Sequence, residues 1–278
     1  MLTRLTPGSR VPVDVRRDGE PLVLTLQLEE QPLFRIPTMM TSTAEGHLLL
    51  SNSAEDGTAR IVDLHDHTER VLRAPDASIA DVALVAQGRY AVTVGYRKGD
   101  YRLWDAASGT MLYRLDGRGK DILTAGVGPG GELIVVGSKE VMAWDIKSGG
   151  PRLLTLGEET VSDVITAVLS EDGRMLVLAQ DDKGAGSAVT VWDLVGGKKL
   201  GQVSFPIEWV RTVALSPDKK VLLIESMGRS AINERIFSLE TLARLASWSQ
   251  PMSFFHPLFT KDSRYIITTA IGHIYGIT

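Results

Sequence analysis

Short apolar runs separated by polar, glycine-rich turns follow one another along most of the chain. The pattern is most complete in the middle of the sequence, where it predicts strands over 164–169, 175–180, 187–193 and 199–204. The first two runs are apolar on both faces, as in strands that lie between neighbouring sheets. The last run is the most polar and is expected at an outer edge. No segment has the spacing of a long amphipathic helix, so the pattern predicts an all-β chain.

This four-strand unit repeats along the sequence. A strand that ends in an aromatic–Asp pair, or in a weaker copy of one, recurs at intervals of 42, 40, 48, 45 and 38 residues. The full pairs are Trp104-Asp105, Trp144-Asp145 and Trp192-Asp193, and the weaker copies are Val62-Asp63, Phe237-Ser238 and Tyr275-Gly276. A second marker, a polar turn after an apolar strand, precedes the pairs at 44–46, 86–88, 129–131, 171–173, 217–219 and 261–263. Two markers that keep the same phase six times indicate six structural repeats.

Four-stranded units with a period of about 43 residues are typical of a β-propeller, because stacked blades bury the faces that one blade leaves exposed. The Trp-Asp pairs, with "LSEDG" at 169–173 and "LSPD" at 215–218, resemble WD repeats over about residues 33–278. The chain departs from that family because no Gly-His pair lies between the fourth strand of one repeat and the first strand of the next. The Asp-His-Ser-Trp hydrogen-bond network of the family is therefore not expected in its usual form. The resemblance is to a degenerate, bacterial-style relative.

The sixth repeat lacks a recognisable fourth strand, because its expected strands at 255–259, 265–269 and 271–277 reach the last residue given. An open ring would leave unpaired strand edges. The alternating segment 21–28 is expected to supply the missing outer strand, as WD-repeat proteins commonly close this way. We therefore expect six four-stranded blades, the last closed by an N-terminal strand, and a division into residues 1–30 and 31–278. Seven blades, or a fragment of a longer chain, are the alternatives.

The N-terminal segment has a second interpretation. Residues 7–32 resemble the last two strands of a PDZ domain of the kind found in bacterial trypsin-like proteases, with Arg17-Asp18-Gly19 as the hairpin turn. Asp-Gly between β-rich strands is a common hairpin signal whatever the ancestry. The peptide-binding loop and helix of that family are absent from the sequence. We expect a two-strand hairpin that either closes the ring or is a remnant of such a domain.

Composition narrows the classes of function. The chain has 30 Lys and Arg against 34 Asp and Glu, a net charge of −4, which argues against nucleic-acid binding through a broad basic field. The absence of cysteine excludes disulfides, cysteine-ligated zinc and thiol catalysis. No apolar run is long enough to cross a bilayer, and the first 30 residues lack the order of a secretory signal. These features favour a cytoplasmic location without membrane insertion, although the compartment itself is not fixed by the sequence.

The tryptophans divide into two groups. Trp104, Trp144 and Trp192 occupy equivalent positions and are expected to pack between blades, because each buries a large apolar area. Trp209 and Trp248 lie near the connections from a fourth strand to the next first strand. An exposed aromatic side chain at that position would be a binding anchor, whereas a buried one would belong to the core.

Charged residues gather in the loops between the second and third strands, which the repeat places on one face. Together with Trp209 they give a candidate binding patch for a protein or peptide partner: Arg97, Lys98, Lys139, Asp182, Trp209 and Arg229. A merely solvated rim is the alternative, because charged loop tips are common on any surface. The signs alternate between blades, so the pattern indicates neither a phosphate-binding nor a cation-binding cavity.

Signs of catalysis are few. The sequence has no Gly-x-Ser-x-Gly elbow, no Walker-type loop and no His-Glu-x-x-His helix. His65 and His67 fall on an expected turn without enough partners for a metal site. We therefore expect no cofactor, no metal and no catalytic residue, and we interpret the chain as a non-enzymatic scaffold for a protein or peptide. The alternatives are a regulatory C-terminal part of a PDZ-containing trypsin-like protease and a small-molecule or hydrolytic propeller with a central-channel site.

Overall fold

A computed structural model gives the arrangement of the chain. The structure describes residues 10–17, 20–27, 40–42, 47–53, 57–74, 78–96, 99–117, 121–153, 156, 163–182, 184–250, 258–260, 262–267 and 274–276. These residues form strands and turns and contain no helix. The chain divides into two units, Met1–Ile36 and Pro37–Thr278.

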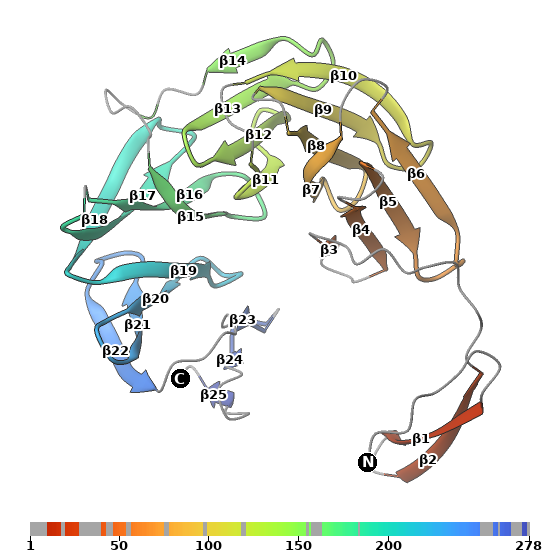
Figure 1. The fold of residues 1–278 in the computed structure, drawn as a ribbon. Coiled ribbons are helices and arrows are strands. Elements are labelled where there is room, and N and C mark those ends of the chain that lie inside the picture. The colour runs from red at the N-terminus through yellow and green to blue at the C-terminus, as the bar shows by residue number, and fades with distance from the viewer. Residues whose placement is uncertain are drawn as a thin grey trace. The chain divides into compact units, whose positions relative to one another are not determined.

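The first unit contains a two-stranded antiparallel hairpin of β1 (Arg10–Arg17) and β2 (Glu20–Gln27) (Figure 1). Arg10 pairs with Gln27 and Arg17 pairs with Glu20, so the strands are in register along their whole length. The structure thus pairs two strands within the segment where a hairpin was expected. Residues 18 and 19, which carry the Asp-Gly turn signal, lie outside the described residues.

The second unit contains consecutive antiparallel sheets in chain order, and we call the successive strands of each sheet a, b, c and d. The first sheet consists of β3 (Met40–Ser42), β4 (Leu48–Ser53), β5 (Thr58–Asp63) and β6 (Glu69–Arg73). The second consists of β7 (Ile79–Val85), β8 (Tyr90–Gly95), β9 (Asp100–Asp105) and β10 (Thr110–Asp116). The third consists of β11 (Thr124–Val127), β12 (Glu132–Gly137), β13 (Glu140–Asp145) and β14 (Pro151–Leu153).

The remaining sheets continue this order. The fourth consists of β15 (Val164–Leu169), β16 (Met175–Asp181), β17 (Gly186–Asp193) and β18 (Lys198–Pro206). The fifth consists of β19 (Trp209–Leu215), β20 (Val221–Met227), β21 (Ile232–Ser238) and β22 (Arg244–Gln250). The sixth has three described strands, β23 (Leu258–Phe259), β24 (Tyr265–Ile267) and β25 (Ile274–Gly276). The strands expected from the sequence in the fourth repeat are confirmed to within two residues at each end.

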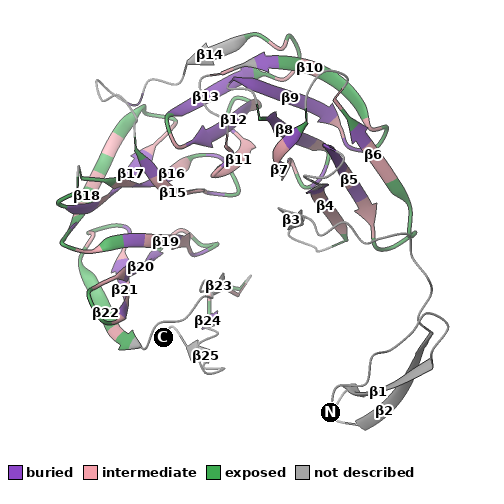
Figure 2. Cartoon of the chain, in the orientation of Figure 1, coloured by how far each residue is buried: buried purple, intermediate pink, exposed green. Residues whose placement is uncertain are grey.

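The core lies between consecutive sheets rather than within any one of them. Five apolar clusters each draw on two neighbouring sheets, from the junction of the first and second to that of the fifth and sixth. Burial follows strand order, because strands b and c are largely buried whereas strands d carry most of the exposed positions (Figure 2). Strand b of the fourth sheet thus has both faces covered, as its apolar run predicts, whereas strand a, for which the same burial was expected, is mostly half-buried.

The three repeat tryptophans are core residues, as expected. Trp104, Trp144 and Trp192 are almost fully buried, and each packs in the cluster that joins its own sheet to the preceding sheet. The indole Nε1 of Trp104 donates to Thr93 Oγ1 at 2.9 Å, and that of Trp192 donates to Thr190 Oγ1 at 3.0 Å. In both sheets a threonine hydroxyl accepts the indole hydrogen bond.

The a–b and c–d turns lie at one end of the sheets and are closed by short-range side-chain bonds. Ser170, Ser216 and Thr260 each donate a hydroxyl hydrogen bond to the Asp two residues later. The same hydroxyls accept a backbone N–H from the first residue of strand b. At the c–d turns, Asp105 accepts from the backbone and hydroxyl of Ser108, and Asp145 accepts from the Lys147 N–H. These bonds lower the pKa of Asp105 and Asp145 below the ordinary value.

Candidate binding face at the b–c end

The opposite end of the sheets carries the b–c turns and the starts of strands a, and hydrogen bonds there join one sheet to the next. Four residues at or close to the start of strand a each donate the backbone N–H to an acceptor in the preceding sheet. Ile79 donates to Gly57 O at 3.1 Å and Val164 donates to Ser138 O at 3.0 Å. Ile122 donates to Asp81 Oδ2 and Val210 donates to Ser187 Oγ, both at 3.0 Å. All four donors are buried, so these hydrogen bonds tie the starts of strands a to the preceding sheet.

Each of three a strands also has a register shift directly after this donor, between Ile79 and Asp81, Val164 and Thr166, and Val210 and Thr212. A bulge bends the strand and redirects the side chains that follow it. The repeated bulge therefore gives the start of each of these a strands the same local geometry.

Of the six residues of the candidate patch, four lie within the described part of the chain and two, Arg97 and Lys98, lie outside it. Lys139 and Asp182 are exposed on b–c loops, and Arg229 is exposed on the b–c loop of the fifth sheet. Trp209 begins β19, where it pairs with Met227 at the end of β20, and its exposed fraction is 44%. All four therefore lie at the same end of their sheets.

The structure brings some of these residues onto adjoining loops. The backbone N–H of Ile207 donates to Ala185 O at 2.8 Å, which joins the connection before Trp209 to the b–c loop that carries Asp182. Arg229 lies two residues after Met227, the partner of Trp209. Lys139 instead forms an ion pair with Asp163 at the junction of the third and fourth sheets. Asp182, Trp209 and Arg229 thus share one region, and Lys139 belongs to a different junction.

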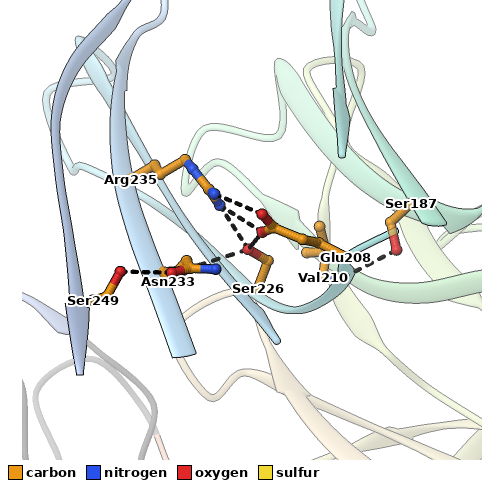
Figure 3. A network of polar contacts seen from close by, with 7 residues as sticks. All are labelled: Ser187, Glu208, Val210, Ser226, Asn233, Arg235 and Ser249. Atoms are coloured by element: carbon orange, nitrogen blue, oxygen red, sulfur yellow. Dashed lines mark hydrogen bonds and ion pairs between the residues drawn. The ribbon is translucent and has the colours of Figure 1, made fainter. Parts of the chain in front are cut away.

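Beneath this region, Glu208 and Arg235 form a two-pronged ion pair (Figure 3). Arg235 Nη1 lies 2.8 Å from Glu208 Oε2, and Nη2 lies 2.8 Å from Oε1. Ser226 donates to Glu208 Oε2 and accepts from Arg235 Nη1 at 2.8 Å. Ser249 donates to Asn233 Oδ1 at 2.7 Å on the neighbouring strand. The hydrogen bonds from Arg235 lower the pKa of Glu208 below its ordinary value of 4.5. The network fixes the backbone on which Trp209 is carried.

Three features of this end were not expected from the sequence. Glu140, which directly follows the loop residue Lys139, begins β13 and is buried, with Tyr101 Oη at 3.5 Å from its carboxylate. Burial raises the pKa of Tyr101, and burial also raises that of Asp81. The Glu208–Arg235 pair and the exposed Ile207 were missed. Pro206 was the available signal for Ile207, because Pro marks the second position of a turn.

The structure also places the histidines and the second tryptophan that the sequence singled out. His65 and His67 are exposed on the turn between β5 and β6, as expected. Among the described residues, no three His, Asp or Glu side chains are grouped so as to hold a metal ion. Trp248 is half-buried and packs in the cluster between the fifth and sixth sheets, so it is a core residue. Within the described part of the chain, no helix has the length and apolar character that a membrane span requires.

Comparison with known proteins identifies the fold. No family model and no curated protein sequence matches the chain. By contrast, 1451 chains of solved structure match it. Among them, Kuenenia stuttgartiensis hydrazine synthase superposes with a TM-score of 0.64 at 13% sequence identity, over 84% of this chain and 73% of that one. The chain has a β-propeller-like fold. Likeness at this level of identity concerns the fold alone.

Proposed function

We propose that this chain is a non-enzymatic scaffold that binds a protein or peptide partner through the b–c end of its sheets. The observation that carries the proposal is the pair of exposed apolar residues Ile207 and Trp209, with exposed fractions of 61% and 44%, on a connection fixed from below by the Glu208–Arg235 pair. An aromatic anchor surrounded by charged residues is the usual composition of a protein contact.

The rigidity of this end supports a binding role. Loops on a fixed scaffold lose less conformational freedom on binding than mobile loops do, so more of the contact energy appears as affinity. The hydrogen bonds between consecutive sheets at Ile79, Ile122, Val164 and Val210 provide such a scaffold. The charged residues Asp182 and Arg229 border the apolar pair and would contribute to the choice of partner.

The proposal is tested by recovering the partner with affinity-tagged full-length protein from a lysate of the source organism. We expect Trp209→Ser combined with Arg229→Glu to reduce recovery at least about fivefold. The matched control is Val195→Ser combined with Lys220→Glu, which removes an exposed apolar side chain and reverses a charge at the opposite end. Equal recovery with both double variants would contradict a binding face at the b–c end.

We further propose that the sheets are degenerate WD-type blades of a six-bladed ring and that the β1–β2 hairpin contributes the closing outer strand. The three described strands of the sixth sheet and the pairing of β1 with β2 support this assignment. The same hairpin is compatible with PDZ ancestry. Deletion of residues 1–30 is expected to lower the melting temperature strongly, because a sheet edge and its apolar face would be left uncovered. An unchanged melting temperature would contradict closure by the hairpin.

A further inference from the structure

Ile207 has a backbone conformation that its side chain disfavours. Its φ is +65°, in the left-handed region, where a β-branched residue is a genuine outlier. The residue follows Pro206, and the Glu208 N–H donates to Phe205 O at 3.3 Å. A proline followed by a residue with positive φ is the arrangement of a type II turn, whose third position favours glycine. The chain has an exposed isoleucine there instead.

The surroundings hold Ile207 in this conformation. Its N–H donates to Ala185 O, and Glu208, the next residue, is fixed by Arg235 and Ser226. Gly186 has a φ of +135° and lies against the turn so closely that a Cβ there would meet the Phe205 carbonyl oxygen. Strain of this kind persists only where neighbouring structure imposes it, and it is concentrated at functional sites. Folding alone gives no reason for an exposed isoleucine at a position that glycine would occupy without strain.

The charges next to Ile207 indicate what it contacts. The loop that accepts its N–H carries two exposed carboxylates, Asp181 and Asp182, and no ion pair joins either of them to another described residue. Lys183, on the same loop, lies outside the described residues. The carboxylate of Glu208 is already neutralised by Arg235. The indole of Trp209, one residue further on, presents a ring face that attracts cations. The apolar pair is therefore bordered on the side of the fourth sheet by negative charge.

We propose that Ile207 and Trp209 form the docking point for a segment of a partner protein in which an apolar side chain is flanked by Lys or Arg. The apolar side chain packs on Ile207, and the flanking cations approach Asp181, Asp182 and the Trp209 ring. This inference rests on the proposed function and specifies the partner's chemistry. Under it, the strain at Ile207 persists because the isoleucine side chain is needed for contact.

The test is selection of a random dodecapeptide library on the full-length protein, followed by affinity measurement of the selected peptides. We expect enrichment of sequences that combine an apolar residue with neighbouring Lys or Arg. Ile207→Gly is expected to weaken these peptides about tenfold while the melting temperature stays constant or rises by about 2 °C, because glycine relieves the backbone strain. Ile207→Asn, which also tolerates a positive φ, is expected to act in the same way.

Two further variants test the carboxylates and provide a control at the opposite end of the sheets. Asp181→Asn combined with Asp182→Asn retains hydrogen-bond acceptors and is expected to weaken the basic peptides about fivefold, with a smaller effect at high salt. Val195→Gly, at the opposite end, removes an equally exposed β-branched side chain whose φ is not in the left-handed region. It is expected to leave peptide affinity unchanged and to lower the melting temperature slightly.

The inference is overturned if no peptides are enriched, if the enriched peptides are acidic, or if Ile207→Gly binds them as tightly as the wild-type protein. These outcomes are distinguishable from failure of the proposed function. If Trp209→Ser with Arg229→Glu still abolishes partner recovery, the b–c end remains the binding face and only the partner chemistry assigned to Ile207 is wrong. If no substitution at this end affects any partner, both proposals fail.

Discussion

The two ends of the sheets are stabilised in different ways. At the a–b and c–d end, each turn is closed by its own side chains, as in the Ser170–Asp172 and Ser216–Asp218 pairs. At the b–c end, buried N–H groups near the starts of strands a donate to the preceding sheet, as in Val164 to Ser138 and Val210 to Ser187. The first end repeats a local sequence motif, whereas the second repeats a geometry that different residues satisfy.

The two ends therefore place different demands on the residues of their turns. Turn motifs that close within a few residues restrict the chain before distant contacts form, so they specify the phase of the repeat. The b–c end is then free to vary in sequence as long as one acceptor faces each buried N–H. Ile207 and the Glu208–Arg235 pair occur at that variable end. We infer that the blade framework depends mainly on the first end and the binding surface on the second.

The largest expected loss of stability follows replacement of Trp144, which lies next to the c–d turn of the third sheet. Trp144 is 1% exposed and packs against Tyr101, with 5.8 Å between ring centroids. Trp144→Ala is expected to lower the free energy of unfolding by about 3–5 kcal/mol, because it removes a large side chain from the layer between two sheets. Chemical denaturation monitored by circular dichroism measures this difference.

Trp209→Ala is the matched control at the b–c end. Because Trp209 is about half exposed, its replacement is expected to change the free energy of unfolding by no more than about 1 kcal/mol. Partner recovery should follow the opposite order, with loss in the Trp209 variant and retention in the folded fraction of the Trp144 variant. Similar stability losses in both variants would remove the distinction between the two ends.

The sequence predicts the features that depend on neighbouring residues and not those that depend on contacts between sheets. The strands around Trp192 and the turn at Asp172 were predictable because hydrophobic alternation and turn chemistry are local signals. The burial of Glu140 was not predictable, because it depends on Tyr101 from the preceding sheet. Trp209 was located from its place in the repeat, but its exposure required coordinates.

The pairing of Glu208 with Arg235 was also inaccessible to sequence reasoning. The two residues are separated by 27 positions, and their contact depends on the register of β19, β20 and β21. The strain at Ile207 is likewise a property of the backbone. Both features arise from long-range packing, so the sequence placed candidate residues at the b–c end without identifying these three residues.

The second prediction tests the network beneath the binding face. Arg235→Met is expected to lower the free energy of unfolding at neutral pH by about 1–3 kcal/mol, because it leaves the partly buried carboxylate of Glu208 without its charged partner. The folded-state pKa of Glu208 is depressed, so the pair stabilises the fold above pH 4.5 and this contribution is lost as the pH falls through the folded-state pKa.

The pH dependence of unfolding checks this assignment. The difference in stability between wild-type protein and the Arg235→Met variant should shrink in acid below pH 4.5. Glu208→Gln retains the shape of the side chain but not its charge. Its difference in stability from the wild-type protein should also shrink below pH 4.5. A difference that stayed constant from neutral to acid pH would indicate a packing effect of Arg235 instead of an ionic one.

The smallest effect is expected at the a–b turns, where one ion pair does join two sheets. Lys219 Nζ lies 2.5 Å from Asp172 Oδ2, and the two side chains are 37% and 38% exposed. Burial alone would raise the pKa of Asp172, but hydrogen bonds from Lys219, Ser170 and the Arg174 backbone lower it to about 2.

Because solvent screens an exposed pair, Asp172→Asn is expected to lower the free energy of unfolding by only about 0.5 kcal/mol at neutral pH. A double-mutant cycle with Lys219→Gln isolates the pairwise contribution. The folded-state pKa is depressed from 3.8, so this contribution should be constant above pH 3.8 and should vanish as the pH falls toward 2. A coupling energy above that of the Glu208–Arg235 pair would place the stronger ionic junction at the turn end and reverse the comparison.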